Sequence, residues 1–141
     1  MRPYIIISIL FLSLTVYGQG KSDSSGCIIQ MDTLTKREVY SFKDGTPKVR
    51  EGTETLMKEI RKLKASNTAI QNDPGGKVVI AFIVEVDGTL TGKRVLKNIK
   101  GTDLAEQLLS LIDNVTWIPE KCNGKVVPTL QIFPVLLHAG Y

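Results

Sequence analysis

The sequence predicts an α+β domain in which a small antiparallel sheet of about three strands carries two helices on one face. Three observations lead to this fold class. Two stretches have helical periodicity, one long apolar stretch ends in an Asp-Gly pair, and a second apolar stretch near the C-terminus contains prolines. The 141 residues are enough for one domain.

Two amphipathic helices are predicted, over residues 53–64 and 103–115. The first has an apolar stripe formed by Leu56, Met57, Ile60 and Leu63. The second has a longer stripe formed by Leu104, Ala105, Leu108, Leu111, Ile112 and Val115. Thr53 is expected to cap the first helix, and Asp103 followed by Glu106 has the spacing of a capping box.

The stretch from 76 to 86, GKVVIAFIVEV, is apolar at both odd and even positions. A strand with two apolar faces is typical of the centre of a sheet that is covered on both sides. Asp87-Gly88 then predicts a tight hairpin, because glycine tolerates positive φ. Residues 89–99 are more polar and are expected to return as a strand nearer the edge of the sheet.

The last predicted strand spans residues 125–137 and contains Pro128 and Pro134. Proline cannot donate to a strand ladder, so a free edge or bulges are expected at these positions. Upstream, CIIQMDTL and REVYSF are candidates for two short strands, followed by the turn-rich segment 43–52.

The N-terminus has the pattern of a secretory signal peptide over residues 1–18. One arginine precedes an apolar stretch, and Val16 and Gly18 suit the −3 and −1 positions, so cleavage is expected after Gly18 or Gln19. The 14 residues from Tyr4 to Tyr17 are short for a membrane span, which needs about 20. An uncleaved anchor is the alternative.

Export makes the two cysteines relevant, since disulfides persist in oxidising compartments. Cys27 and Cys122 form one disulfide or remain two free thiols. The sequence leaves both readings open, because it does not give the approach of the two Cα atoms that a disulfide requires. The net charge of +4 is mild and the basic residues are dispersed, which argues against a nucleic-acid partner.

No arrangement of residues predicts an enzyme, and neither a cofactor nor a metal site is expected. His138 is the sole histidine and lies four residues from the C-terminus, where a solvated surface residue is expected. Asp73 and Asp87 read as turn residues, so they do not form a catalytic carboxylate pair.

In order, the chain has Gly76, the apolar strand, Asp87-Gly88, RVL, the helix from Asp103, Trp117 with Pro119, NGKVV and LQIFPVLL. This ordered set resembles the C-terminal domain of TonB, the periplasmic energy transducer of Gram-negative bacteria. The resemblance covers the domain over residues 51–137, which follows the signal peptide (1–18) and a leader with possible short strands (19–50) and precedes a tail (138–141). The expected core scaffold is Phe82, Val84, Asp87, Gly88, Leu108, Trp117 and Pro119.

The resemblance implies a non-enzymatic periplasmic module that binds a TonB-dependent outer-membrane transporter or another envelope protein. In that family an extended partner peptide pairs with the edge of the last strand. Here the corresponding residues are Val126, Val127, Thr129, Leu130, Gln131, Ile132 and Phe133. The prolines of this strand suit an edge, but they equally suit protection of an edge from pairing.

Two alternative functions remain beside this one. The first is a membrane-anchored minimal energy transducer, which requires an uncleaved N-terminal segment. The second is a disulfide-stapled structural protein that forms a homodimer through the same last strand. Trp117 is expected in the core, with the border of a peptide groove as its alternative place.

Overall fold

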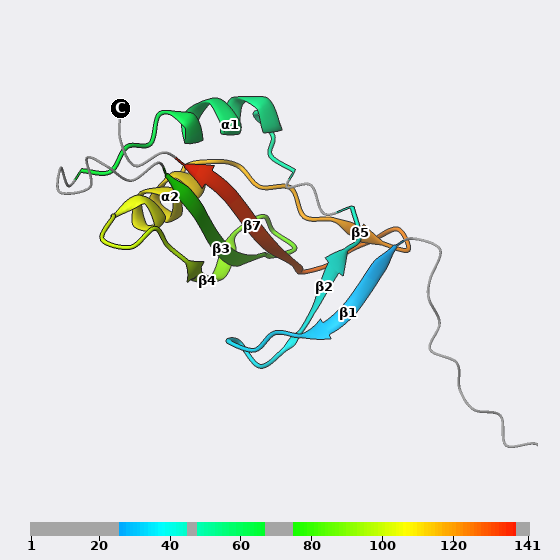
Figure 1. Cartoon of the computed structure of the whole chain (residues 1–141). Coiled ribbons are helices and arrows are strands. Elements are labelled where there is room, and N and C mark those ends of the chain that lie inside the picture. The colour runs from blue at the N-terminus through cyan, green and yellow to red at the C-terminus, as the bar shows by residue number, and fades with distance from the viewer. Residues whose placement is uncertain (1–25, 45–47, 67–74, 138–141) are drawn as a thin grey trace, which may run out of the picture.

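The computed structural model describes residues 26–44, 48–66 and 75–137 (Figure 1). The elements in chain order are β1 (Cys27–Met31), β2 (Glu38–Phe42), α1 (Thr53–Arg61), β3 (Gly76–Val84), β4 (Leu90–Lys97), α2 (Leu104–Ile112), β5 (Lys121–Cys122), β6 (Lys125–Val126) and β7 (Thr129–Leu137). The predicted signal peptide and His138 lie outside the described residues.

The prediction of about three antiparallel strands is wrong. In the described part of the chain, a five-stranded mixed sheet has the order β1-β2-β7-β3-β4, and β5 and β6 form a separate two-stranded sheet. The added strands are the β1–β2 hairpin, whose β2 runs parallel to β7 and pairs with it at Tyr40 and Thr129. This pairing joins residues far apart in sequence, so no local pattern indicates it.

The longest ladder joins β3 and β7, which pair antiparallel from Gly76–Leu137 to Val84–Thr129. On the other side of β3, β4 pairs antiparallel and ends the sheet. The prediction of a central apolar strand followed by a more polar edge strand is therefore confirmed. Alternate β3 residues, beginning with Val78, enter one core, while Ala81 and Ile83 are buried on the opposite face.

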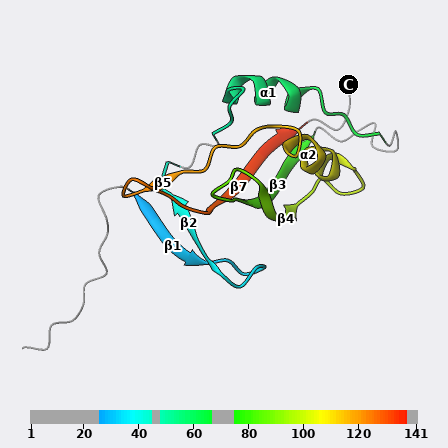
Figure 2. The same cartoon turned by 180° about the vertical axis from the view of Figure 1, so that it is seen from behind.

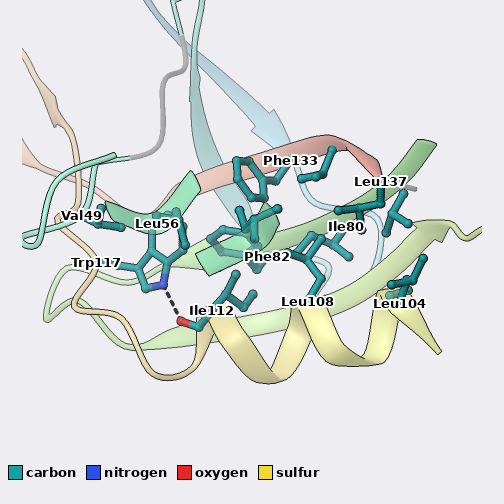
Figure 3. Packing of buried hydrophobic residues seen from close by; sticks show 14 of the residues in the cluster. Val49, Leu56, Ile80, Phe82, Leu104, Leu108, Ile112, Trp117, Phe133 and Leu137 are labelled. Atoms are coloured by element: carbon teal, nitrogen blue, oxygen red, sulfur yellow. Dashed lines mark hydrogen bonds between the residues drawn. The ribbon is translucent and has the colours of Figure 1, made fainter. Parts of the chain in front are cut away.

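The two helices supply the other half of this core (Figure 3). Leu56 and Ile60 of α1 are buried, as are Leu104, Leu108 and Ile112 of α2. Burial of each such side chain stabilises the fold by roughly 1.5–3 kcal/mol. The apolar stripes predicted from the sequence are therefore confirmed. Within the described ranges, neither helix is long and apolar enough to cross a membrane.

The predicted helix caps are confirmed only in part. Gly52, with φ 88°, is the N-cap of α1, so Thr53 is the first helical residue instead of the cap. Asp103 is the N-cap of α2, but its side chain makes no cap hydrogen bond. Its carboxylate instead accepts hydrogen bonds from Ser66 and Gln107, and these lower the pKa of Asp103 to about 2.

Trp117 lies in the core, as predicted, with 3% of its surface exposed. Its ring meets Phe82 edge to face with centroids 4.8 Å apart, and its indole N–H donates to the carbonyl of Ile112 at 2.8 Å (Figure 3). A buried tryptophan needs such an acceptor for its polar atom. Trp117 therefore joins the end of α2 to the centre of the sheet.

The Asp87-Gly88 turn lies against the backbone of the same tryptophan. Gly88 has φ 85°, and a Cβ there would lie 2.9 Å from the carbonyl oxygen of Trp117. Asp87 accepts hydrogen bonds from the backbone N–H and the hydroxyl of Thr89. Both the positive φ and the close approach of backbone therefore require glycine at position 88.

Figures 1 and 2 show the β1–β2 hairpin on the side of the β7, β3 and β4 layer that faces away from α1. Its tip packs over β4, since a Cβ at Gly92 would lie 3.1 Å from Cγ2 of Thr35. The hairpin tip therefore covers part of the sheet face opposite the helices, while β2 pairs with β7 at only one residue.

Candidate functional site

The side of β7 that faces away from β3 is paired over only a small part of its length. β2 contributes one residue pair, Tyr40 with Thr129, whereas the ladder on the β3 side extends to Leu137. Within the described residues no other strand pairs with this side. We call the stretch Ile132–Leu136 on this side of β7 the open edge.

The direction of the main-chain groups follows from one hydrogen bond. The N–H of Tyr40 donates to the carbonyl of Pro128 at 2.9 Å, so Pro128 faces β2. Alternate residues of an antiparallel ladder direct N–H and C=O to the same side. Ile132, Pro134 and Leu136 therefore direct their main-chain groups outward, and the missing N–H of Pro134 costs no ladder bond to β3.

The side chains of the open edge alternate strictly between the two faces. Phe133, Val135 and Leu137 are buried in the core with the helices. Ile132 and Leu136 lie on the opposite face and are 56% and 80% exposed. An extended peptide paired with this edge would thus lie beside exposed apolar side chains as well as main-chain donors and acceptors.

A hollow of about 270 Å³ lies where β2 diverges from β7. We call it the notch, and it is lined by Gln30, Ser41, Phe42, Lys43, Leu130, Gln131 and Ile132. Its far wall comes from β1 and β2, which the sequence predicts as strands but does not place beside β7. No sequence signal therefore identifies Phe42 or Lys43 as part of this site.

The hairpin that forms this wall is held at its tip by polar contacts. Arg94 of β4 donates to Asp32 at 2.6 Å, and Arg37 bonds to Glu85. Burial alone would raise the pKa of Asp32, but hydrogen bonds from Thr35 and the charge of Arg94 prevail and lower the pKa of Asp32 to about 2. The Asp32 side chain is fully buried, so removal of Arg94 leaves a buried carboxylate without its opposite charge.

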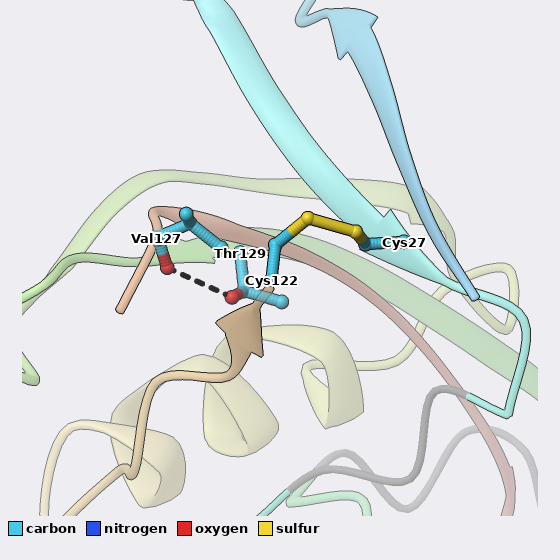
Figure 4. The surroundings of a disulfide bond; sticks show 4 residues. All are labelled: Cys27, Cys122, Val127 and Thr129. Atoms are coloured by element: carbon cyan, nitrogen blue, oxygen red, sulfur yellow. Dashed lines mark hydrogen bonds between the residues drawn. A yellow bond between two sulfur atoms is a disulfide. The ribbon is translucent and has the colours of Figure 1, made fainter. Parts of the chain in front are cut away.

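The base of the hairpin is held by a covalent bond. Cys27 at the start of β1 and Cys122 of β5 form a disulfide, with Cα atoms 5.9 Å apart (Figure 4). This separation is within the usual range for disulfides, and the disulfide reading of the sequence is confirmed. Because the tip and the base are both fixed, the notch has a defined wall.

The seven edge residues expected from the sequence do not share one surface. Val126 lies in β6, and Val127 is buried in the link to β7. The hydroxyl of Thr129 donates to the carbonyl of Val127 at 3.0 Å (Figure 4). By the alternation along β7, Gln131 and Phe133 direct their main chain to β3. Leu130 flanks the pair with Tyr40 of β2, so Ile132 alone of the seven lies at the open edge.

A second hollow, of about 350 Å³, lies between the helices. It is lined by Glu51, Thr55, Leu56, Glu59, Leu111, Asn114 and Val115. Its walls come from α1, α2 and the residues just before α1 and just after α2, so it offers an extended partner no strand edge to pair with. The notch and the open edge together are therefore the stronger candidate for binding an extended chain.

No protein-family model matches the chain, and no curated protein is significantly similar to it. The resemblance to the TonB C-terminal domain therefore depends on the ordered motifs in the sequence.

Proposed function

We propose that the chain is a non-enzymatic periplasmic protein-binding module that captures an extended segment of a partner by strand addition at the open edge. The observation that carries this proposal is the unequal pairing of β7. One side forms a full ladder with β3, and the other side pairs with β2 at one residue.

The open edge offers five outward main-chain groups between Ile132 and Leu136. These are the N–H and C=O of Ile132, the C=O of Pro134, and the N–H and C=O of Leu136. Each hydrogen bond contributes about 0.5–1.5 kcal/mol net. Pro134 has no N–H to donate. A bound strand therefore pairs with the N–H groups of Ile132 and Leu136, before and after Pro134 in the sequence.

The notch provides a place for one end of the bound segment. It is lined by Leu130 and Ile132 of β7 and by Phe42 and Lys43 at the end of β2. An apolar side chain of the partner fits against Ile132 and Phe42, while Lys43 favours an acidic group nearby. Main-chain pairing then supplies affinity, and the notch supplies selectivity.

A TonB-dependent outer-membrane transporter is the partner to test first, because the ordered motifs resemble the TonB C-terminal domain. The probe is a set of peptides copied from the plug domains of such transporters. Binding is measured by isothermal titration calorimetry with the chain purified in the form that the cell yields.

The variant Ile132→Pro tests the mechanism, because it removes an outward N–H and leaves the ladder to β3 intact. The loss of one bond of about 1 kcal/mol weakens peptide binding about fivefold. Ile132→Ala is the matched control, since it shortens the side chain and keeps the N–H. If Ile132→Pro binds every peptide as tightly as Ile132→Ala, strand addition at the open edge is wrong.

A further inference from the structure

The two outer strands of the five-stranded sheet differ in how they are protected from pairing with another chain. β4 carries Lys93, Arg94 and Lys97, and its pairing with β3 has two register shifts. Charged residues and bulges on an edge strand discourage further pairing. The β4 edge therefore has both of these protective features.

β1 has neither feature. Its sequence, CIIQM, contains no charged residue, and its register with β2 is continuous from Cys27–Phe42 to Met31–Glu38. Ile28, Ile29 and Met31 are 55%, 58% and 59% exposed. Because Ile28 and Ile29 point to opposite faces of the strand, apolar surface is exposed on both sides of the hairpin.

The main-chain direction along β1 follows from the hydrogen bonds at the two ends of the hairpin. Asp32 donates its N–H to Arg37, and Lys43 donates its N–H to Gly26. These bonds place the even-numbered residues of β1 toward β2. Ile29 and Met31 therefore direct their N–H and C=O groups away from β2.

We propose that β1 is a self-association edge, at which two copies of the chain pair β1 to β1 in antiparallel orientation about a two-fold axis. An axis through Gln30 places Ile29 of one copy opposite Met31 of the other. These two residue pairs exchange four main-chain hydrogen bonds, because all of the groups concerned point outward.

A second copy fits this edge better than a charged partner strand. β1 is uncharged, so two copies approach without charge repulsion and need no complementary charge. A two-fold axis makes the contact self-complementary and closed, and a dimer forms instead of a filament. The contact is small, so a weak, concentration-dependent dimer is expected.

This edge is separate from the open edge of β7. Pairing through β1 uses neither Ile132 nor Leu136, so a dimer keeps both open edges, and Gln30 is the one residue that the dimer axis shares with the lining of the notch. The inference therefore does not depend on the proposed function, and either proposal stands if the other fails.

Sedimentation equilibrium of the chain, purified in the form that the cell yields, tests the proposal between about 10 µM and about 1 mM, a range that covers weak association. A monomer–dimer equilibrium is expected. Ile29→Lys puts a charge at the centre of the edge and weakens the dimer at least about tenfold. Leu96→Lys is the matched control on β4, where Leu96 is 52% exposed, and it leaves the equilibrium unchanged.

The variant Gln30→Cys gives a second readout that does not require a destabilising charge. The axis through Gln30 makes this residue a non-hydrogen-bonded pair with its own copy, with Cα atoms about 4.5 Å apart, which suits a disulfide. Oxidised glutathione then yields a covalent dimer on a non-reducing gel, and Leu96→Cys yields none.

Three results overturn the proposal. They are a monomer over the whole concentration range, equal weakening of the dimer by Ile29→Lys and Leu96→Lys, and the absence of a covalent Gln30→Cys dimer. A chain that stays monomeric and pairs its β1 strand with a strand of another protein also overturns the proposal, because β1 then binds a different partner from a second copy.

Discussion

Replacement of Cys27 and Cys122 by serine is expected to lower the free energy of unfolding by about 4 to 5 kcal/mol. The two cysteines are 95 positions apart, so the disulfide closes a loop that includes most of the domain. The chain-entropy model gives about 4.7 kcal/mol at 25 °C for a loop of this length. That is a large part of the 5–15 kcal/mol typical of native domains.

The free energy of unfolding is measured by urea denaturation of the oxidised wild type, the reduced wild type and the Cys27→Ser/Cys122→Ser variant. The last two should agree, because both lack the cross-link, and a reductant should not affect the variant. The variant is still expected to fold, since neither cysteine belongs to the main core cluster. A loss of less than about 1 kcal/mol would show that closing the loop between Cys27 and Cys122 does not stabilise the fold as loop-closure entropy requires.

Three further perturbations test the core and the hairpin by urea denaturation. Gly88→Ala should lose about 2 kcal/mol or more, because it combines φ 85° with a Cβ 2.9 Å from a carbonyl oxygen; a neutral effect would contradict this. Trp117→Phe should lose about 1–3 kcal/mol, because it leaves the carbonyl of Ile112 without its donor; wild-type stability would show that this bond is unimportant. Asp32 has its pKa lowered from 3.8 to about 2, so the stability that its charge provides is present above pH 4 and is lost as the pH falls toward 2. Asp32→Asn should thus be less stable than wild type by about 2 kcal/mol at pH 5.5, and a gap that persists at pH 2 would show that the charge of Asp32 facing Arg94 is not its cause.

The local elements were predictable because their signals are contained in short stretches. The stripe from Leu104 to Ile112 has helical spacing, and the strand from Gly76 to Val84 is apolar on both faces. Asp87-Gly88 indicates a turn, because glycine readily adopts the positive φ that the turn requires. Such patterns depend on neighbours within a few residues, and the structure has a helix, a strand and a turn at these places.

The strand predicted over 125–137 shows where local reading fails. Asn123 and Gly124 both have positive φ, and they turn the chain so that Lys125–Val126 pairs back with Lys121–Cys122. The chain then starts a new strand after Pro128. The apolar sequence alone does not show that Lys125 and Val126 pair with β5, while the residues from Thr129 onward pair with β3.

The sheet order and the notch were not predictable for a related reason. The pairs that place the hairpin are Tyr40 with Thr129, Arg94 with Asp32, and Cys27 with Cys122. Each joins residues more than sixty positions apart, and nothing near any one of them in sequence indicates its partner. The leader predicted over residues 19–50 therefore contains two strands of the main sheet.

The prolines of the last strand became interpretable only with the register. Pro134 faces Val79 across the ladder, and its nitrogen lies on the open side. The sequence left use and protection of this edge equally open. In the structure, Pro134 removes only one hydrogen-bond donor from the open edge, because the N–H groups of Ile132 and Leu136 still point outward.

Peptide binding at the open edge of β7 can be observed residue by residue. The most direct measurement is a ¹H–¹⁵N NMR titration of the chain with transporter plug peptides, with β4 as the internal reference. If a peptide strand adds to the open edge, the amide signals of Ile132, Leu136 and Phe42 shift with added peptide and the Ile132 amide becomes protected from hydrogen exchange. Unchanged signals at these residues, or shifts confined to β4, would contradict strand addition at the open edge.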